Sequence, residues 1–141
     1  MPLLKMYALT AVVLTLKMAV NSVVQGVARN RARVFTVEED ARMMGGRLEA
    51  TEVAIVDKAA RAWRNDLENI PIFLILAGIY VMAGLGRGAF EVYCSVFMVM
   101  RILHTYFYLN GIQPWRTVAY TVGAITMLAL VIQLFVQVVL A

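Results

Sequence analysis

Four apolar blocks occupy most of this 141-residue chain, at residues 6–28, 70–85, 89–109 and 118–141. A helix that crosses the hydrocarbon core of a bilayer needs about 20 mainly apolar residues. Three of the blocks have this length, and the block at 70–85 reaches it if its helix begins in the polar segment before it, near residue 52. A hydrophobic fraction of 62% is also typical of a membrane protein. The pattern predicts an all-α integral membrane protein.

The short connections between the blocks set the order of the helices. Gly84, Gly86 and Gly88 indicate a tight turn, so the second and third helices should be antiparallel neighbours. Gly111 and Pro114 should end the third helix. We therefore expect one domain, a four-helix up-down bundle with helices at about 6–28, 52–85, 89–109 and 117–141 and a loop at about 29–51.

The basic residues are distributed unevenly. Most of the arginines lie between residues 29 and 64. Because cytoplasmic connections carry an excess of Lys and Arg, this segment and the connection at 110–116 are expected on the cytoplasmic side, with both chain ends opposite. The membrane would be the endoplasmic reticulum in a eukaryote or the inner membrane in a bacterium. Acidic residues are interspersed with the basic ones, which argues against a nucleic acid partner.

Cysteine and histidine are too few for several kinds of site. Cys94 is the only cysteine and His104 the only histidine. An intramolecular disulfide is therefore impossible, and we expect no zinc or haem site. A lone His on a helix is often a hydrogen-bonding core residue, and the functional alternative for His104 is a role in positioning a ligand.

Two polar faces recur at helical spacing on neighbouring helices, formed by Arg61, Arg64, Asn65 and Glu68 and by Arg101, His104 and Tyr108. Charges at membrane depth are costly and normally face a protein interior or cavity. Guanidinium groups bind carboxylates through paired hydrogen bonds, and a glutamate suits an ammonium group. The faces predict a pocket for a ligand with several carboxylates and one ammonium group. The alternative is that arginine and glutamate neutralise each other as structural pairs.

Two further features remain open. Arg116 and Thr117 begin the fourth helix, where the positive end of the helix dipole can stabilise an anion such as a thiolate. Thr117 could equally be a simple N-cap. Lys17 lies in the middle of the first helix, where it should pair with a carboxylate or polar group across the bundle, with ion passage as the alternative.

Residues 61–70, 101–109 and 116–121 carry a combination of motifs that resembles the MAPEG family, the membrane-associated proteins in eicosanoid and glutathione metabolism. The resemblance extends to residues 34–41 and to Lys17-Met18. It is strongest to the branch that holds microsomal glutathione transferases and prostaglandin E synthases. It implies a homotrimer of four-helix subunits, with glutathione bound between neighbours near the cytoplasmic side and a lipophilic substrate entering from the bilayer.

The resemblance also implies roles for single residues. Arg116 and Thr117 would hold the glutathione sulfur as a thiolate, and Asp40 is a further catalytic candidate. The glutathione-binding residues would be Arg29 from the adjacent subunit together with Arg61, Arg64, Asn65, Glu68, Arg101, His104, Tyr108, Arg116 and Tyr120. Trp63 and Pro71 depart from the family pattern, because the family commonly has histidine at the first position and its proline one residue later.

The leading hypothesis is a glutathione-dependent transferase or peroxidase that acts on lipophilic electrophiles or lipid hydroperoxides. A prostaglandin-H to prostaglandin-E isomerase is a second enzyme hypothesis, favoured by Asp40 and its spacing to Arg64. A non-catalytic lipid-binding scaffold is the alternative from another class, and the intact Arg116-Thr117 pair argues against it. A small ion or proton transporter is the least favoured reading.

Overall fold

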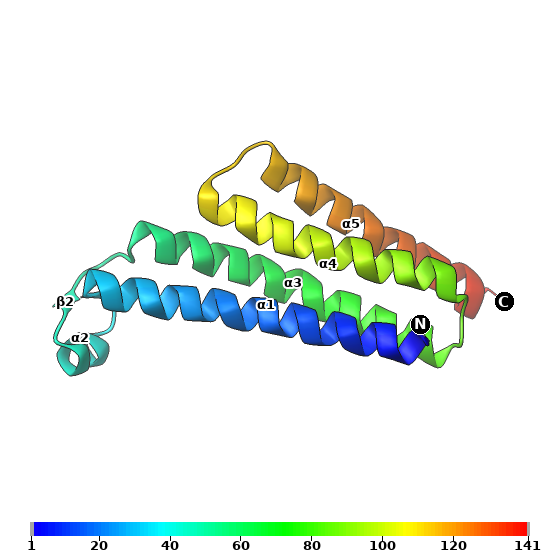
Figure 1. Ribbon diagram of the computed structural model, residues 1–141, viewed down its shortest axis with the longest axis horizontal. Coiled ribbons are helices and arrows are strands. Elements are labelled where there is room, and N and C mark those ends of the chain that lie inside the picture. The colour runs from blue at the N-terminus through cyan, green and yellow to red at the C-terminus, as the bar shows by residue number, and fades with distance from the viewer. Residues whose placement is uncertain (1, 141) are drawn as a thin grey trace.

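The computed structural model describes residues 2–140 and is built almost entirely from helices (Figure 1). Four helices are long and apolar enough to cross a membrane. They are α1 (Leu3–Ala32), α3 (Ala54–Met82), α4 (Arg87–Asn110) and α5 (Trp115–Leu134), the last continuing into the π-helix η1 (Phe135–Val139). The prediction of an all-α membrane bundle with four spanning helices is confirmed.

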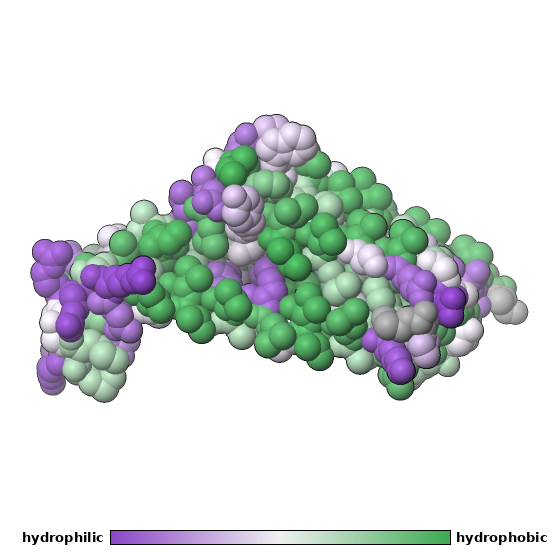
Figure 2. Space-filling model, viewed as in Figure 1, coloured by the Kyte–Doolittle hydropathy of each residue, from purple (hydrophilic) through white to green (hydrophobic). Residues whose placement is uncertain are grey.

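The surface fits a bilayer. Hydrophobic residues cover most of the length of the helices, and hydrophilic residues gather at both ends and in a patch midway along one seam (Figure 2). At 1.5 Å per residue, the 30 residues of α1 span about 45 Å, which exceeds the roughly 30 Å hydrocarbon core. The chain is therefore a multi-pass membrane protein whose longest helices project beyond the hydrocarbon.

The helices alternate in direction and form two pairs, α1 with α3 and α4 with α5 (Figure 1). The start of α1, the α3–α4 turn and the end of α5 lie at one end of the bundle, called here the turn end. The α1–α3 and α4–α5 connections lie at the other, the loop end. Gly84 and Gly111 hold left-handed conformations at φ 64° and 69°, which only glycine adopts without strain.

The connection between α1 and α3, predicted as a loop, contains secondary structure of its own. It contains a short helix, α2 (Glu38–Met44), and two strands, β1 (Val34–Phe35) and β2 (Arg47–Leu48), which pair in parallel. Phe35 is buried against Gly46, where an added Cβ atom would collide with its ring. This contact, together with the left-handed Gly45, folds the segment back onto itself.

The helix bounds also shift by a few residues. α1 runs past the predicted residue 28 to Ala32, because Arg29 and Arg31 favour the negative end of the helix dipole. The helix predicted at 52–85 is shorter at both ends, whereas α4 is longer at both ends and α5 begins two residues early, at Trp115. The predicted last residue, 141, lies outside the described residues.

The apolar core fills the turn end of the bundle. The rings of Phe73 and Phe97 stack with centroids 3.9 Å apart, and those of Tyr80 and Phe90 lie 4.9 Å apart. Leu130 of α5 is fully buried in the same cluster. Because these side chains join α3, α4 and α5 at one end, the polar faces of α3 and α4 are left to the middle and to the loop end.

Candidate functional site

A layer of buried polar pairs lies between the apolar core and the loop end. Lys17 of α1 forms an ion pair with Asp66 of α3, whose carboxylate is fully buried. One residue earlier, Asn65 accepts a hydrogen bond of 2.6 Å from Nη1 of Arg101 on α4. Lys17 thus pairs with a carboxylate across the bundle, as its position in the middle of the helix predicts. These two pairs hold α3 to α1 and to α4 at the same level.

Arg101 has a different environment from the other arginines. Its side chain is fully buried, and its guanidinium carbon lies 5.3 Å from the ring centroid of Phe97 and 5.7 Å from that of Tyr120. A Cβ atom added to Gly123 would lie 3.4 Å from its Nη2. The resemblance implies a contact with glutathione, but in this chain Arg101 lies behind Asn65 and does not line the cavity described next.

A cavity of about 230 Å³ opens between α3 and α4, toward the loop end of that layer. It brings together six of the residues predicted from the two polar faces, Arg61, Arg64, Asn65 and Glu68 from α3 and His104 and Tyr108 from α4. Residues at helical spacing in the sequence share one face of each helix because α3 and α4 are regular antiparallel helices around this cavity.

The charges in the cavity are only partly neutralised. Arg61 pairs with Asp57, one turn earlier on α3, with Nε–O distances of 3.0 and 3.1 Å. Between residues 2 and 140, the structure gives Arg64 and Glu68 no ion pair and no side-chain hydrogen bond, and Nδ1 of buried His104 is also unpartnered. The cavity therefore presents one free cation and one free anion, while His104 lines it with its Nδ1 buried.

The first turn of α5 adds a cation beside the cavity. The guanidinium carbon of Arg116 lies 4.7 Å from the ring centroid of Tyr108, which lines the cavity. Thr117 is exposed, and its hydroxyl lies 3.2 Å from the side-chain amide of Gln113. With that amide oriented to satisfy both neighbours, its oxygen accepts a hydrogen bond from Arg116 Nε at 3.0 Å. The N-cap position belongs to Pro114, so the reading of Thr117 as the N-cap is wrong.

Tyr120 lies one turn further along α5. Its ring centroid is 6.1 Å from that of His104, which lines the cavity, but the exposed Tyr120 does not line it itself. Sequence reasoning missed Asp57 and Gln113. Asp57 had a usable signal, because it lies four residues before Arg61 on one helix. Gln113 had none, since its role depends on how the α4–α5 connection folds.

Two predicted residues lie apart from the cavity within one chain. Arg29, in the last turn of α1, donates to Glu52 at 2.6 and 2.9 Å, and the Thr36 hydroxyl lies 3.3 Å from the same oxygen. Asp40 belongs to α2, which lies beyond the end of the α1–α3 pair and away from α4 and α5 (Figure 1). A contribution of either residue to this kind of cavity therefore requires a second subunit.

Comparison with known sequences identifies the family of this chain. Residues 7–136 match the sequence model of the MAPEG family. This chain belongs to the MAPEG family. The matched range contains the whole cavity, the buried polar layer and Arg116.

Two kinds of relative are similar in sequence to this MAPEG chain. Prostaglandin E synthase from the dog, Canis lupus familiaris, is 33% identical over 129 residues, which are 91% of this chain and 84% of the relative. The human enzyme is 32% identical over 134 residues, 94% and 88% of the two chains. Microsomal glutathione S-transferase 1 from the rat, Rattus norvegicus, is 38% identical over 69 residues, 48% of this MAPEG chain and 44% of the relative.

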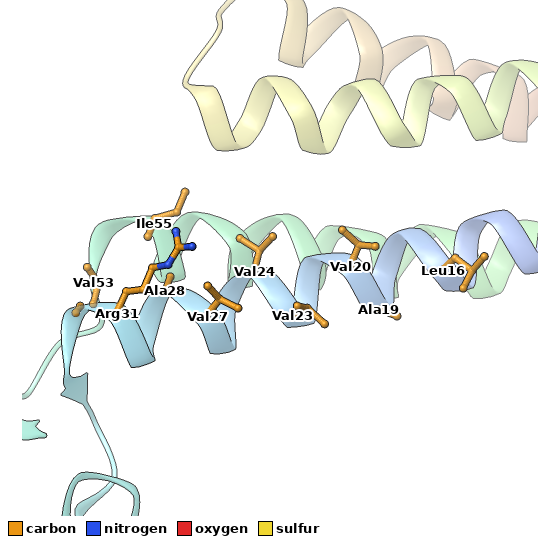
Figure 3. A pocket seen from close by; sticks show the side chains of 11 residues that line it. Leu16, Ala19, Val20, Val23, Val24, Val27, Ala28, Arg31, Val53 and Ile55 are labelled. Atoms are coloured by element: carbon orange, nitrogen blue, oxygen red, sulfur yellow. The ribbon is translucent and has the colours of Figure 1, made fainter. Parts of the chain in front are cut away.

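A second, larger hollow lies on the outer face of α1. This groove of about 830 Å³ is lined by apolar side chains from Leu16 to Ala28 and from the start of α3, with Arg31 at its loop end (Figure 3). It holds too few polar groups to orient a charged ligand. The smaller polar cavity is therefore the candidate site, although the groove has more volume.

The described residues, 2–140, contain no group of three or more His, Cys, Asp or Glu side chains that could hold a metal ion.

Proposed function

We propose that this MAPEG protein is a glutathione-dependent membrane enzyme, a transferase or peroxidase acting on lipophilic electrophiles or lipid hydroperoxides. The observation that carries the proposal is the unpaired Arg64 and Glu68 in one cavity. Glutathione bears two carboxylates and one ammonium group, so Glu68 fits the ammonium and the arginines fit the carboxylates. The relatives named as prostaglandin E synthases and as a glutathione S-transferase support the same cosubstrate.

Arg116 is the residue proposed to activate the sulfur. A free thiol has a pKa near 8.5, so only a few per cent is thiolate at neutral pH unless the site favours the anion. Arg116 lies beside the cavity-lining Tyr108, in the first turn of α5, where the helix dipole is positive. Its charge and the Thr117 hydroxyl would stabilise the thiolate, which then attacks an electrophile that arrives from the bilayer.

The site is proposed to be completed by a homotrimer, with the cavity on the cytoplasmic side. A cavity of 230 Å³ lies below the roughly 300–1,000 Å³ of typical ligand sites. A neighbouring subunit would cover it, and Arg29 and Asp40, which lie apart from the cavity in their own chain, would belong to a neighbour's site.

Prostaglandin-H to prostaglandin-E isomerisation with glutathione is the second candidate function. Its support is the extent of the match, since the dog and human prostaglandin E synthases align with 91% and 94% of this chain. The same cavity would hold glutathione in this reaction, so the two candidates differ in the lipophilic substrate and in the fate of glutathione, which the transferase or peroxidase consumes and the isomerase regenerates.

The proposal is tested on detergent-purified protein with a generic aryl halide, a lipid hydroperoxide and prostaglandin H as separate substrates. We expect glutathione-dependent turnover of at least one. Glu68→Gln should raise the Kd for glutathione about tenfold, because it removes a charged hydrogen-bond acceptor worth about 1.5 kcal/mol or more. Glu49→Gln, an exposed charge change in the α1–α3 connection, is the matched control.

An unchanged glutathione Kd in Glu68→Gln would reject this placement of the ligand. Wild-type protein that neither binds glutathione nor turns over any of the three substrates would reject the enzyme proposal and favour the lipid-binding scaffold.

A further inference from the structure

Lys58 lies at the loop end of the cavity and is absent from every set of site residues considered so far. It is exposed and precedes Arg61 by three residues, so both lie on the same face of α3. A Cβ atom added to Gly111, the residue that follows α4, would lie 3.7 Å from its Nζ. Lys58 therefore reaches from α3 to the end of α4.

This bridge lies one turn beyond the cavity on both helices. Arg61 is the cavity-lining residue nearest the start of α3, and Tyr108, three residues before Gly111, is the one nearest the end of α4. Because α3 and α4 run antiparallel, the Lys58–Gly111 contact closes the same end of the cavity. The structure gives Lys58 no ion pair and no side-chain hydrogen bond within residues 2–140.

The positions of the charges orient a ligand along the cavity. Glu68 lies two turns deeper than Arg61 and is the only acidic residue of the lining. An ammonium group that pairs with Glu68 places the γ-glutamyl end of glutathione deep, beside Arg64. The glycyl carboxylate then points toward the loop end. A tripeptide that overfills 230 Å³ extends past Arg61 to Lys58.

We propose that Lys58 binds the glycyl carboxylate of glutathione at the loop end of the cavity. This inference rests on the proposed function, since it names a further contact of the same ligand. The ammonium group is available for it because Lys58 has no ion pair and no side-chain hydrogen bond within residues 2–140. A purely structural role is the alternative, because a lysine near a helix C-terminus stabilises that end of the helix.

The experiment separates these roles with two ligands and three variants. Lys58→Met should raise the Kd for glutathione on the order of fivefold, the upper range for one exposed ion pair. It should leave the Kd for the glycyl monoethyl ester of glutathione nearly unchanged, because esterification removes the carboxylate. Lys58→Arg should restore binding of glutathione. Lys5→Met, which deletes the same charge at the turn end, should change neither Kd.

Salt provides an independent readout, since the glutathione Kd should depend less on ionic strength in Lys58→Met than in wild type. Equal losses for glutathione and its ester would assign Lys58 to helix stabilisation and overturn the inference. If the wild-type protein binds glutathione and Lys58→Met has an unchanged glutathione Kd, this inference is overturned but the proposed function is not. Wild-type protein without any glutathione binding would remove the proposed function as well.

Discussion

Arg64 and Glu68 are four residues apart on α3, a spacing at which opposite charges often pair, yet they form no ion pair. The order of the two residues contributes to the lack of an ion pair. On a helix, an acid four residues before a base pairs better than the reverse, and here Arg64 comes before Glu68. This separation is the strongest argument at the scale of single residues against a purely structural reading of the polar face. Arg61 follows the structural reading more closely, since Asp57 already neutralises it.

The role of Arg116 is expected to appear in catalysis rather than in binding. Arg116→Leu should lower kcat much more than it raises the glutathione Kd, because the guanidinium favours the thiolate, worth about 1.4 kcal/mol for each pKa unit. The thiolate absorbance of the bound complex should disappear. Thr117→Val should lose less activity, since it deletes one hydroxyl and keeps the shape. Both quantities are measured by steady-state kinetics and ultraviolet difference spectra.

Arg87→Leu is the matched control, because it removes an arginine at the turn end, where it pairs with Glu91. Wild-type turnover and thiolate absorbance in Arg116→Leu would move sulfur activation to another group, with His104, Tyr108 or Tyr120 as candidates.

At the scale of elements, α3 is the helix that organises the bundle. Adjacent residues on it, Asn65 and Asp66, turn to different partners, one to Arg101 of α4 and the other to Lys17 of α1. Burying these groups is expensive unless each is paired, so the two contacts fix the rotation of α3. That rotation directs Arg64 and Glu68 into the cavity.

Breaking the Lys17–Asp66 pair should therefore destabilise the fold. Lys17→Met leaves a fully buried carboxylate without its partner, at a cost of about 3–5 kcal/mol. The double variant Lys17→Met/Asp66→Leu should recover much of that loss, because neither charge remains. Thermal unfolding in detergent measures both, with Lys5→Met as the control. A melting temperature of Lys17→Met equal to that of wild type would contradict this account.

The spanning helices and the cavity faces were predictable because they follow from length and periodicity, which the sequence states directly. Arg61, Arg64 and Glu68 recur at helical spacing, and the structure brings them into one cavity. The β1–β2 pair was not predictable, since two residues per strand are too few to show a period. The contact of Arg101 with Asn65 was also not predictable, because a motif does not show which neighbouring side chain a buried residue meets.

At the scale of the whole molecule, the chain is layered along its length. An apolar core fills the turn end, buried ion and amide pairs lie in the middle, and the polar cavity opens toward the loop end. One subunit leaves that cavity small and leaves Arg29 and Asp40 outside it. These features favour an oligomer in which neighbouring chains complete each site.

A complementation experiment tests the trimer. Arg29→Met and Arg64→Met should each lose glutathione-dependent activity when expressed alone. Co-expressed chains should regain part of it, because a site with an intact Arg64 can receive an intact Arg29 from its neighbour. Detergent-corrected mass measurement should give three times the subunit mass of 15.7 kDa. Two inactive variants that stay inactive together, or a fully active monomer, would contradict the shared site.

The burial of Cys94 in the core has a practical consequence. The only thiol of the chain is fully buried in the apolar core, where a water-soluble maleimide cannot reach it. The wild-type chain should therefore not react with such a reagent. A cysteine introduced at an exposed position would be the only residue that is labelled. Thr51 is exposed at the loop end, and Gly86 at the turn end has open space for a side chain. Probes at these two positions mark opposite faces of a sealed vesicle without any change to the folded interior.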